Sequence, residues 1–155
     1  MKTRILVLGL GNDLLADDAV GILAARELKE RLEGKADVVE TAEHGVVLLD
    51  HFIGYDKAIV VDAIKTGKNS PGTVLEIDPG KLMATAHPSP HYTGLPELFV
   101  LARQFEVEFP KEVRIVAMEV EDLYTLGGEI TPAVRDSIPE LVGKVEEIVL
   151  EWVPR

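Results

Sequence analysis

The sequence of 155 residues contains no cysteine. Disulfide bonds and thiolate chemistry are therefore excluded, and a metal site would have to use oxygen and nitrogen ligands. Long apolar runs are also missing. No stretch approaches the roughly 20 residues of a membrane-spanning helix, and the apolar run that starts at Ile5 stops at a glycine, too short for a signal sequence. These absences predict a cytoplasmic protein without a membrane span.

Basic residues are in deficit, with 16 Lys and Arg against 27 Asp and Glu and a formal net charge of −11. A chain this acidic is a poor candidate for binding nucleic acid through its general field. The charge fits a basic peptide or a cation as partner, or it serves solubility alone. The sequence also lacks the G-x-S-x-G pattern of a serine-hydrolase nucleophile, since Ser70, Ser89 and Ser137 do not have the two flanking glycines.

Short apolar runs alternate with segments of helical periodicity along the chain. This alternation predicts an α/β fold, a three-layer sandwich in which about five largely parallel strands carry helices on both faces. The length predicts a single domain over residues 1–155. The predicted strands begin or lie at 5–8, 38–39, 58–61, 73–77 and 113–118, and the predicted helices at 20–32, 45–52, 95–105 and 132–152. Thr131 is the predicted N-cap of the last helix, with Pro132 at its first position.

Two acids follow the first predicted strand, within the stretch from Gly9 to Gly21. The glycines at its start suggest a dinucleotide-binding fingerprint, but Leu14 stands where the third glycine is needed. Asp17 and Asp18 would repel a pyrophosphate, whereas they suit a cation. The structural alternative is that Asp17 caps the following helix.

Two further candidates follow other predicted elements. Asp62 comes directly after the apolar run 58–61, and His91 lies in a loop that opens a helix. Because sites in parallel sheets form at the carboxyl ends of strands, we expect Asp18, Asp62 and His91 to converge in one cleft. Such a set suits nickel, zinc, iron or manganese. The alternatives are a solvated turn for Asp62 and a surface position for His91.

The stretch from Gly9 to Gly21, called the first motif below, resembles the start of the nickel-iron hydrogenase maturation endopeptidases, with its pattern G-x-G-N-x4-D-[DE]-x2-G. Asp62 also fits, in the order expected for that family. The later matches are Ser89, His91, Gly94, Leu95 and Thr131-Pro132. The resemblance implies an α/β peptidase that removes a short C-terminal extension from the large-subunit precursor of a nickel-iron hydrogenase.

The resemblance also implies roles for individual residues. Asp18, Asp62 and His91 would recognise nickel that the substrate supplies, so no permanent cofactor is expected, although cadmium or zinc would substitute in a crystal. Asp17, Asp18 and Glu40 are the predicted catalytic acids. Glu40 stands where many members have the acid of a D-G-G-T-x-G stretch, and here the segment reads E-T-A-E-H-G. This departure affects the expected substrate range.

Two mechanisms stay open at this point. The nickel either polarises the scissile carbonyl or activates water, with Asp17 or Glu40 as base, or it only docks the substrate while a carboxylate activates water. Other functions also stay open: a small-molecule metallohydrolase with the same ligands, a nucleotide-binding protein of Rossmann type, and a non-catalytic assembly chaperone.

Overall fold

A computed structural model describes residues 2–79, 100 and 102–154. Its sheet has the strand order β2-β1-β3-β5-β4. The strands are β1 (Ile5–Leu10), β2 (Asp37–Thr41), β3 (Lys57–Ile64), β4 (Val74–Ile77) and β5 (Glu112–Glu119). All neighbouring pairs are parallel except β4, which runs antiparallel to β5. The prediction of five largely parallel strands is therefore confirmed.

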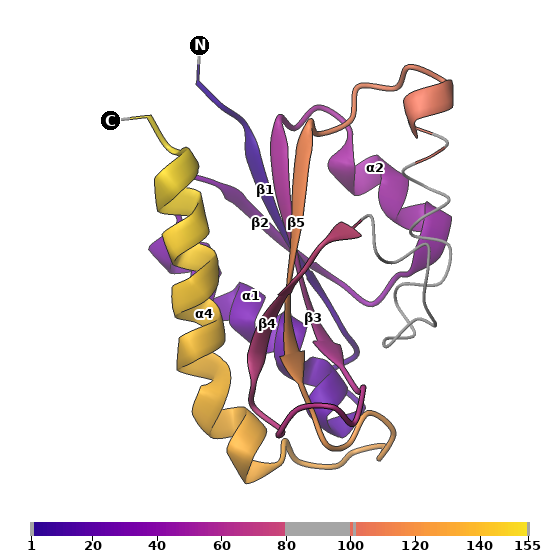
Figure 1. Cartoon of the computed structure of the whole chain (residues 1–155), viewed down its shortest axis with the longest axis vertical. Helices are drawn as coiled ribbons and strands as arrows, with labels where there is room; N and C mark the ends of the chain where they lie inside the picture. The colour runs from indigo at the N-terminus through magenta and orange to yellow at the C-terminus, as the bar shows by residue number, and fades with distance from the viewer. Residues whose placement is uncertain (1, 80–99, 101, 155) are drawn as a thin grey trace.

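Helices cover both faces of this sheet, so the molecule has three layers (Figure 1). The 3-10 helix η1 (Ala16–Ala19) lies between β1 and α1 (Val20–Arg31) in the chain and contacts β3. One face of the sheet carries α1 and the long α4 (Pro132–Trp152). The other carries η2 (Gly45–Leu48) and α2 (Leu49–Phe52). Successive strand residues point to opposite faces, so Val7 and Ile59 pack under α1 and α4, whereas Leu8 and Val60 pack under α2.

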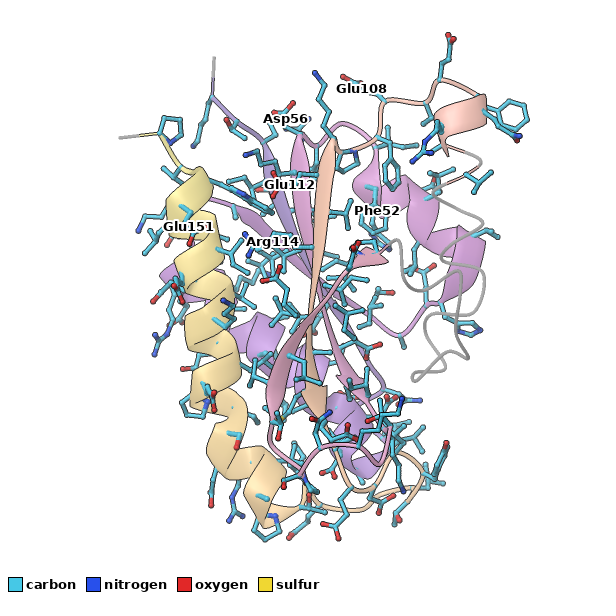
Figure 2. All side chains as sticks on the ribbon, viewed as in Figure 1. Phe52, Asp56, Glu108, Glu112, Arg114 and Glu151 are labelled. Atoms are coloured by element: carbon cyan, nitrogen blue, oxygen red, sulfur yellow. The ribbon has the colours of Figure 1, made fainter. Side chains whose placement is uncertain are left out.

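Polar side chains fix the long helix to the edge of the sheet. Arg114 of β5 donates from Nη2 to Glu76 of β4 at 2.7 Å, and its Nη1 lies 3.7 Å from Glu151 of α4 (Figure 2). The hydrogen bond with Glu76 is the main reason why the pKa of Arg114 is raised. These contacts join two strands and a helix far from the predicted site.

The structure differs from the prediction in several boundaries. The third strand does not stop before Asp62 but runs through it to Ile64, because Ala63 and Ile64 are also buried. Thr131 occupies the predicted N-cap position of α4, yet its hydroxyl makes no capping hydrogen bond. The predicted helix 95–105 lies mostly outside the described residues. In the part of the chain that is described, no helix is long and apolar enough to cross a membrane.

Candidate active site

The carboxyl ends of the parallel strands meet at one edge of the sheet, the lower edge in Figure 1. The loop after β1 leads there into η1 and α1, and the loop after β5 leads into α4. A ligand in an open α/β sheet is usually bound at this edge. Asp17, Asp18 and Asp62 all lie in elements that reach it.

Two glycines allow the start of α1 to approach the strands closely. A methyl group on Gly21 would lie 2.1 Å from the carbonyl oxygen of Leu10 and 2.7 Å from that of Val61. A methyl group on Gly11 would lie 2.3 Å from the carbonyl oxygen of Asp18. The glycines of the first motif therefore serve the packing of the chain that carries Asp18 against β1 and β3.

Asp18 and Asp62 are brought to the same end of the sheet. Asp18 lies in η1, which contacts β3, and only 2% of its surface is exposed. Asp62 is fully buried inside β3, where one carboxylate oxygen accepts a hydrogen bond from the Ala63 amide at 2.7 Å. The solvated-turn alternative for Asp62 is therefore wrong. Both buried carboxylates therefore belong to elements at the carboxyl end of the parallel strands.

Asp17 has a different environment from its neighbour. It is fully buried, and it does not cap α1. Its carboxylate instead accepts hydrogen bonds from the backbone amides of Glu121, Asp122 and Thr131. The preceding residue, Ala16, has a φ of +31°, which residues other than glycine rarely adopt. Such a conformation costs about 1–3 kcal/mol and must be held by surrounding contacts.

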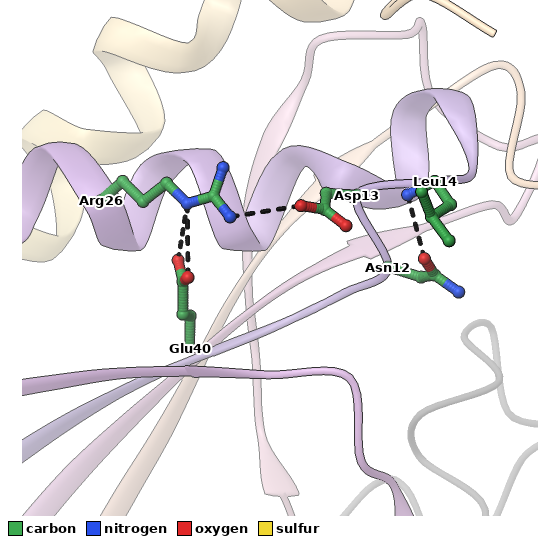
Figure 3. A network of polar contacts seen from close by, with 5 residues as sticks. All are labelled: Asn12, Asp13, Leu14, Arg26 and Glu40. Carbon is green, nitrogen blue, oxygen red and sulfur yellow. Dashed lines mark hydrogen bonds and ion pairs between the residues drawn. The ribbon is translucent and has the colours of Figure 1, made fainter. Parts of the chain in front are cut away.

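Glu40 lies on the other face of the sheet from Asp62. It pairs in register with Gly9, and its side chain points to α1, where Arg26 Nε donates to it at 2.9 Å (Figure 3). Arg26 also reaches Asp13 at 3.2 Å. The hydrogen bond with Glu40 is the main cause of the raised pKa of Arg26. The structure does not bring Glu40 together with Asp62, and its catalytic role stays a prediction.

The loop that carries the acids is shaped by Asn12. Its side-chain oxygen accepts a hydrogen bond from the Leu14 backbone amide at 2.9 Å (Figure 3), and its backbone amide donates to the Asp18 carbonyl at 3.3 Å. This is the turn-forming role typical of asparagine. Sequence reasoning assigned no role to Asn12, although its place in the first motif was a usable signal.

The remaining predicted ligand, His91, lies outside the described residues, as does Ser89. Among the residues that are described, no group of three His, Asp or Glu side chains is arranged to hold a metal. Asp18 and Asp62 are thus the members of the predicted set that the structure describes, and their role as ligands stays a prediction. A hollow lined by Ala102, Phe109 and Val113 lies at the opposite, amino-terminal end of β5 and takes no part in this arrangement.

Comparison with known proteins identifies the family. A sequence model for hydrogenase maturation proteases matches residues 22–148. The chain belongs to this family. The Hydrogenase 2 maturation protease of Escherichia coli (strain K12) is 33% identical to it over 160 residues, which cover 98% of this chain and 96% of the relative. The alignment with this relative spans nearly the whole chain, whereas the family model starts at residue 22.

Solved structures agree with this assignment. The hydrogenase maturating endopeptidase HybD from E. coli has a TM-score of 0.75 at 32% identity, covering 99% of this chain and 98% of that one. The NiFe hydrogenase maturation protease HybD from Thermococcus kodakarensis has a TM-score of 0.73 at 27% identity, covering 95% and 99%. The predicted family, the three-layer α/β fold and the peptidase class of this hydrogenase maturation protease are thereby confirmed.

Proposed function

We propose that this hydrogenase maturation protease removes a C-terminal extension from the large-subunit precursor of a nickel-iron hydrogenase, after nickel has been inserted. The observation that carries the proposal is the pair of buried carboxylates, Asp18 and Asp62, near one strand end in a member of this family. Buried acids are retained where a cation or a chemical step needs them. The net charge of −11 is compatible with a basic partner segment.

We assign nickel recognition to Asp18, Asp62 and His91. Nickel accepts both carboxylate oxygen and imidazole nitrogen, and a set with a single imidazole holds it less tightly than three or four histidines or thiolates would. A weak, open site suits a metal that arrives with the substrate. Zinc or cadmium would occupy the same groups. The part of His91 rests on the family resemblance.

Hydrolysis requires that a water oxygen attacks the scissile carbonyl carbon while a base takes the proton, and that the new amine is protonated when the C–N bond breaks. Asp17 is already engaged by several donors, and Glu40 pairs with Arg26. We assign the activation of water to the substrate's nickel, with Asp18 as the acid beside it in the proposed site. Nickel contributes by polarising the carbonyl or lowering the pKa of water. The proposed place of action is the cytoplasm.

The test is a matched pair of digests, on nickel-loaded and nickel-free precursor, with mass spectrometry of the large subunit as readout. Wild-type protein should remove the extension only from the nickel-loaded form. Asp18→Asn, Asp62→Asn and His91→Ala should each lower cleavage by at least about 100-fold, as removal of a charged group at a reacting centre does. Asp136→Asn, on the exposed surface of α4, is the matched control and should cleave normally.

Circular dichroism and a thermal midpoint for each variant separate loss of chemistry from loss of the fold, which matters for the buried Asp62. Equal cleavage of both precursor forms would remove nickel recognition from the proposal. A wild-type protein that purifies with stoichiometric zinc and leaves the precursor intact would favour the small-molecule metallohydrolase instead.

A further inference from the structure

The Asp17 carboxylate is saturated with hydrogen bonds. Its Oδ2 accepts from the amides of Glu121 at 3.1 Å and Asp122 at 2.9 Å, and its Oδ1 accepts from the amide of Thr131 at 2.8 Å. The Thr131 hydroxyl lies 2.9 Å from Oδ2 and 3.1 Å from Oδ1. An ionised carboxylate offers about four acceptor sites, and four donor groups surround this one.

Saturation of this kind argues against a role as general base. A base must present a free lone pair to the water or substrate that it deprotonates, within hydrogen-bond reach. Asp17 has no exposed surface, and its contacts are with N–H and O–H donors from the protein itself. A water molecule could approach the carboxylate only if one of these donors moved away.

The same hydrogen bonds join η1 to both ends of the loop between β5 and α4, more than 100 residues further along the chain. Asp17 belongs to η1, Asp122 follows β5, and Thr131 precedes α4. The link is reciprocal, because the Asp17 amide donates to the Asp122 carbonyl at 2.8 Å. Directly before η1, Leu15 forms an antiparallel bridge with Leu126 of the same β5–α4 loop. The short helix is therefore tied to the loop that joins β5 to α4.

The position of Asp18 depends on this link. Asp18 is the next residue, its amide donates to the Leu15 carbonyl at 2.8 Å, and its carbonyl accepts from Asn12 at 3.3 Å. Its backbone is thus part of the same turn as Asp17. The positive φ of Ala16 means that this turn is not one the chain adopts without external support.

We propose that Asp17 is a positioning residue, which fixes the nickel-recognising Asp18 by tying η1 to the loop after β5 and to the first residue before α4. The inference rests on the proposed function, and it replaces a role as base with a role as fixed acceptor. Thr131 is the matching donor, which explains why its hydroxyl does not cap α4.

The experiment compares Asp17→Asn, Thr131→Val and Thr131→Ser with wild type, using steady-state cleavage of nickel-loaded precursor across pH. Asp17→Asn replaces one acceptor oxygen with an NH2 group that faces the N–H and O–H donors around it. Thr131→Val removes the hydroxyl donor. Both should raise KM by about 10- to 100-fold, as loss of a partner that orients a metal ligand does. The shape of the kcat–pH profile should stay unchanged, and Thr131→Ser, which keeps the hydroxyl, should restore wild-type KM.

Amide hydrogen exchange over residues 12–20 gives a readout that needs no cleavage. Exchange should be faster in Asp17→Asn and Thr131→Val and normal in Thr131→Ser. Loss of the acidic limb of the kcat–pH profile in Asp17→Asn alone would show that Asp17 is a base and overturn the inference. Unchanged KM or unchanged exchange in both variants would also overturn it. Failure of wild-type protein to cleave the precursor counts against the proposed function, while the exchange measurement still decides the positioning role.

Discussion

At the scale of single residues, the first motif is explained by packing as much as by chemistry. Gly9, Gly11 and Gly21 each lack the space for a methyl group, because backbone atoms of the neighbouring element lie within 2.1–2.4 Å of where it would be. The same pattern in a dinucleotide-binding protein makes room for a pyrophosphate. Here the room at Gly21 is taken by the carbonyl oxygens of Leu10 and Val61.

We predict that Gly21→Ala destabilises the fold by about 1–3 kcal/mol or more, as overpacking against backbone does, and lowers cleavage by displacing η1. Gly143→Ala is the matched control, since Gly143 lies in α4 with no atom within 4 Å of an added methyl group. There alanine should stabilise by about 0.5–1 kcal/mol. Urea midpoints of both variants check the prediction, and an unchanged midpoint for Gly21→Ala would contradict it.

The partners of individual acids show how far sequence reasoning reaches. The location of Asp18 and Asp62 at the carboxyl end of the sheet could be predicted, because apolar runs locate strands and parallel strands end at one edge. The partners of Asp17 could not, since they lie 104, 105 and 114 residues away along the chain. No local periodicity encodes such contacts. For the same reason, the pairing of Glu40 with Arg26 was not foreseen.

At the scale of elements, the strands and the long helices were predictable from apolar periodicity, whereas the direction of β4 was not assigned. Only residues 65–73 separate β3 from β4, and a crossover to a parallel strand needs a dozen or more residues. This length argument was available in the sequence. The 3-10 helix η1 was missed because its start needs the positive φ of Ala16, which composition does not signal.

The last helix contains an internal proline, and we predict that its removal stabilises the protein. Pro139 lies within α4, where a proline removes one backbone hydrogen bond and crowds the preceding turn. Because the side chain is exposed, Pro139→Ala should raise the free energy of unfolding by about 1–3 kcal/mol. Pro132→Ala, at the first helical position, is the control and should change little. Urea unfolding followed by circular dichroism measures both, and a lower midpoint for Pro139→Ala would refute the prediction.

At the scale of the whole molecule, acidic charge and stability are linked. The net charge of −11 implies self-repulsion at neutral pH, which weakens as carboxylates are protonated toward the isoelectric point near 4.8. The folded structure opposes this protonation, because it holds several carboxylates in their charged form. The pKa is lowered by hydrogen bonds or ion pairs at Glu43, Glu76, Glu119 and Asp122.

Glu119, at the end of β5, is the most buried of these four acids, with 1% of its surface exposed. Burial by itself raises its pKa, but hydrogen bonds from Thr66, Gly67 and Asn69 outweigh burial and hold the pKa below its ordinary value. They tie the loop after β3 to β5. A group with a lowered folded pKa stabilises the fold above its unfolded pKa, about 4.3 for glutamate. That contribution is lost as pH falls through the folded pKa.

We therefore predict that stability changes little between pH 7 and 5 and then falls steeply below about pH 4.3, as the unfolded chain takes up more protons than the folded one. Glu119→Gln, whose amide NH2 would face the Thr66 and Gly67 amides, should lose about 1–3 kcal/mol at pH 7. Its urea midpoint should then depend less on pH in the acid range than that of wild type. The exposed Glu33→Gln variant is the control and should follow the wild-type curve. If the urea midpoints of Glu119→Gln and wild type fell in parallel below about pH 4.3, protonation of Glu119 would not be a cause of the loss of stability.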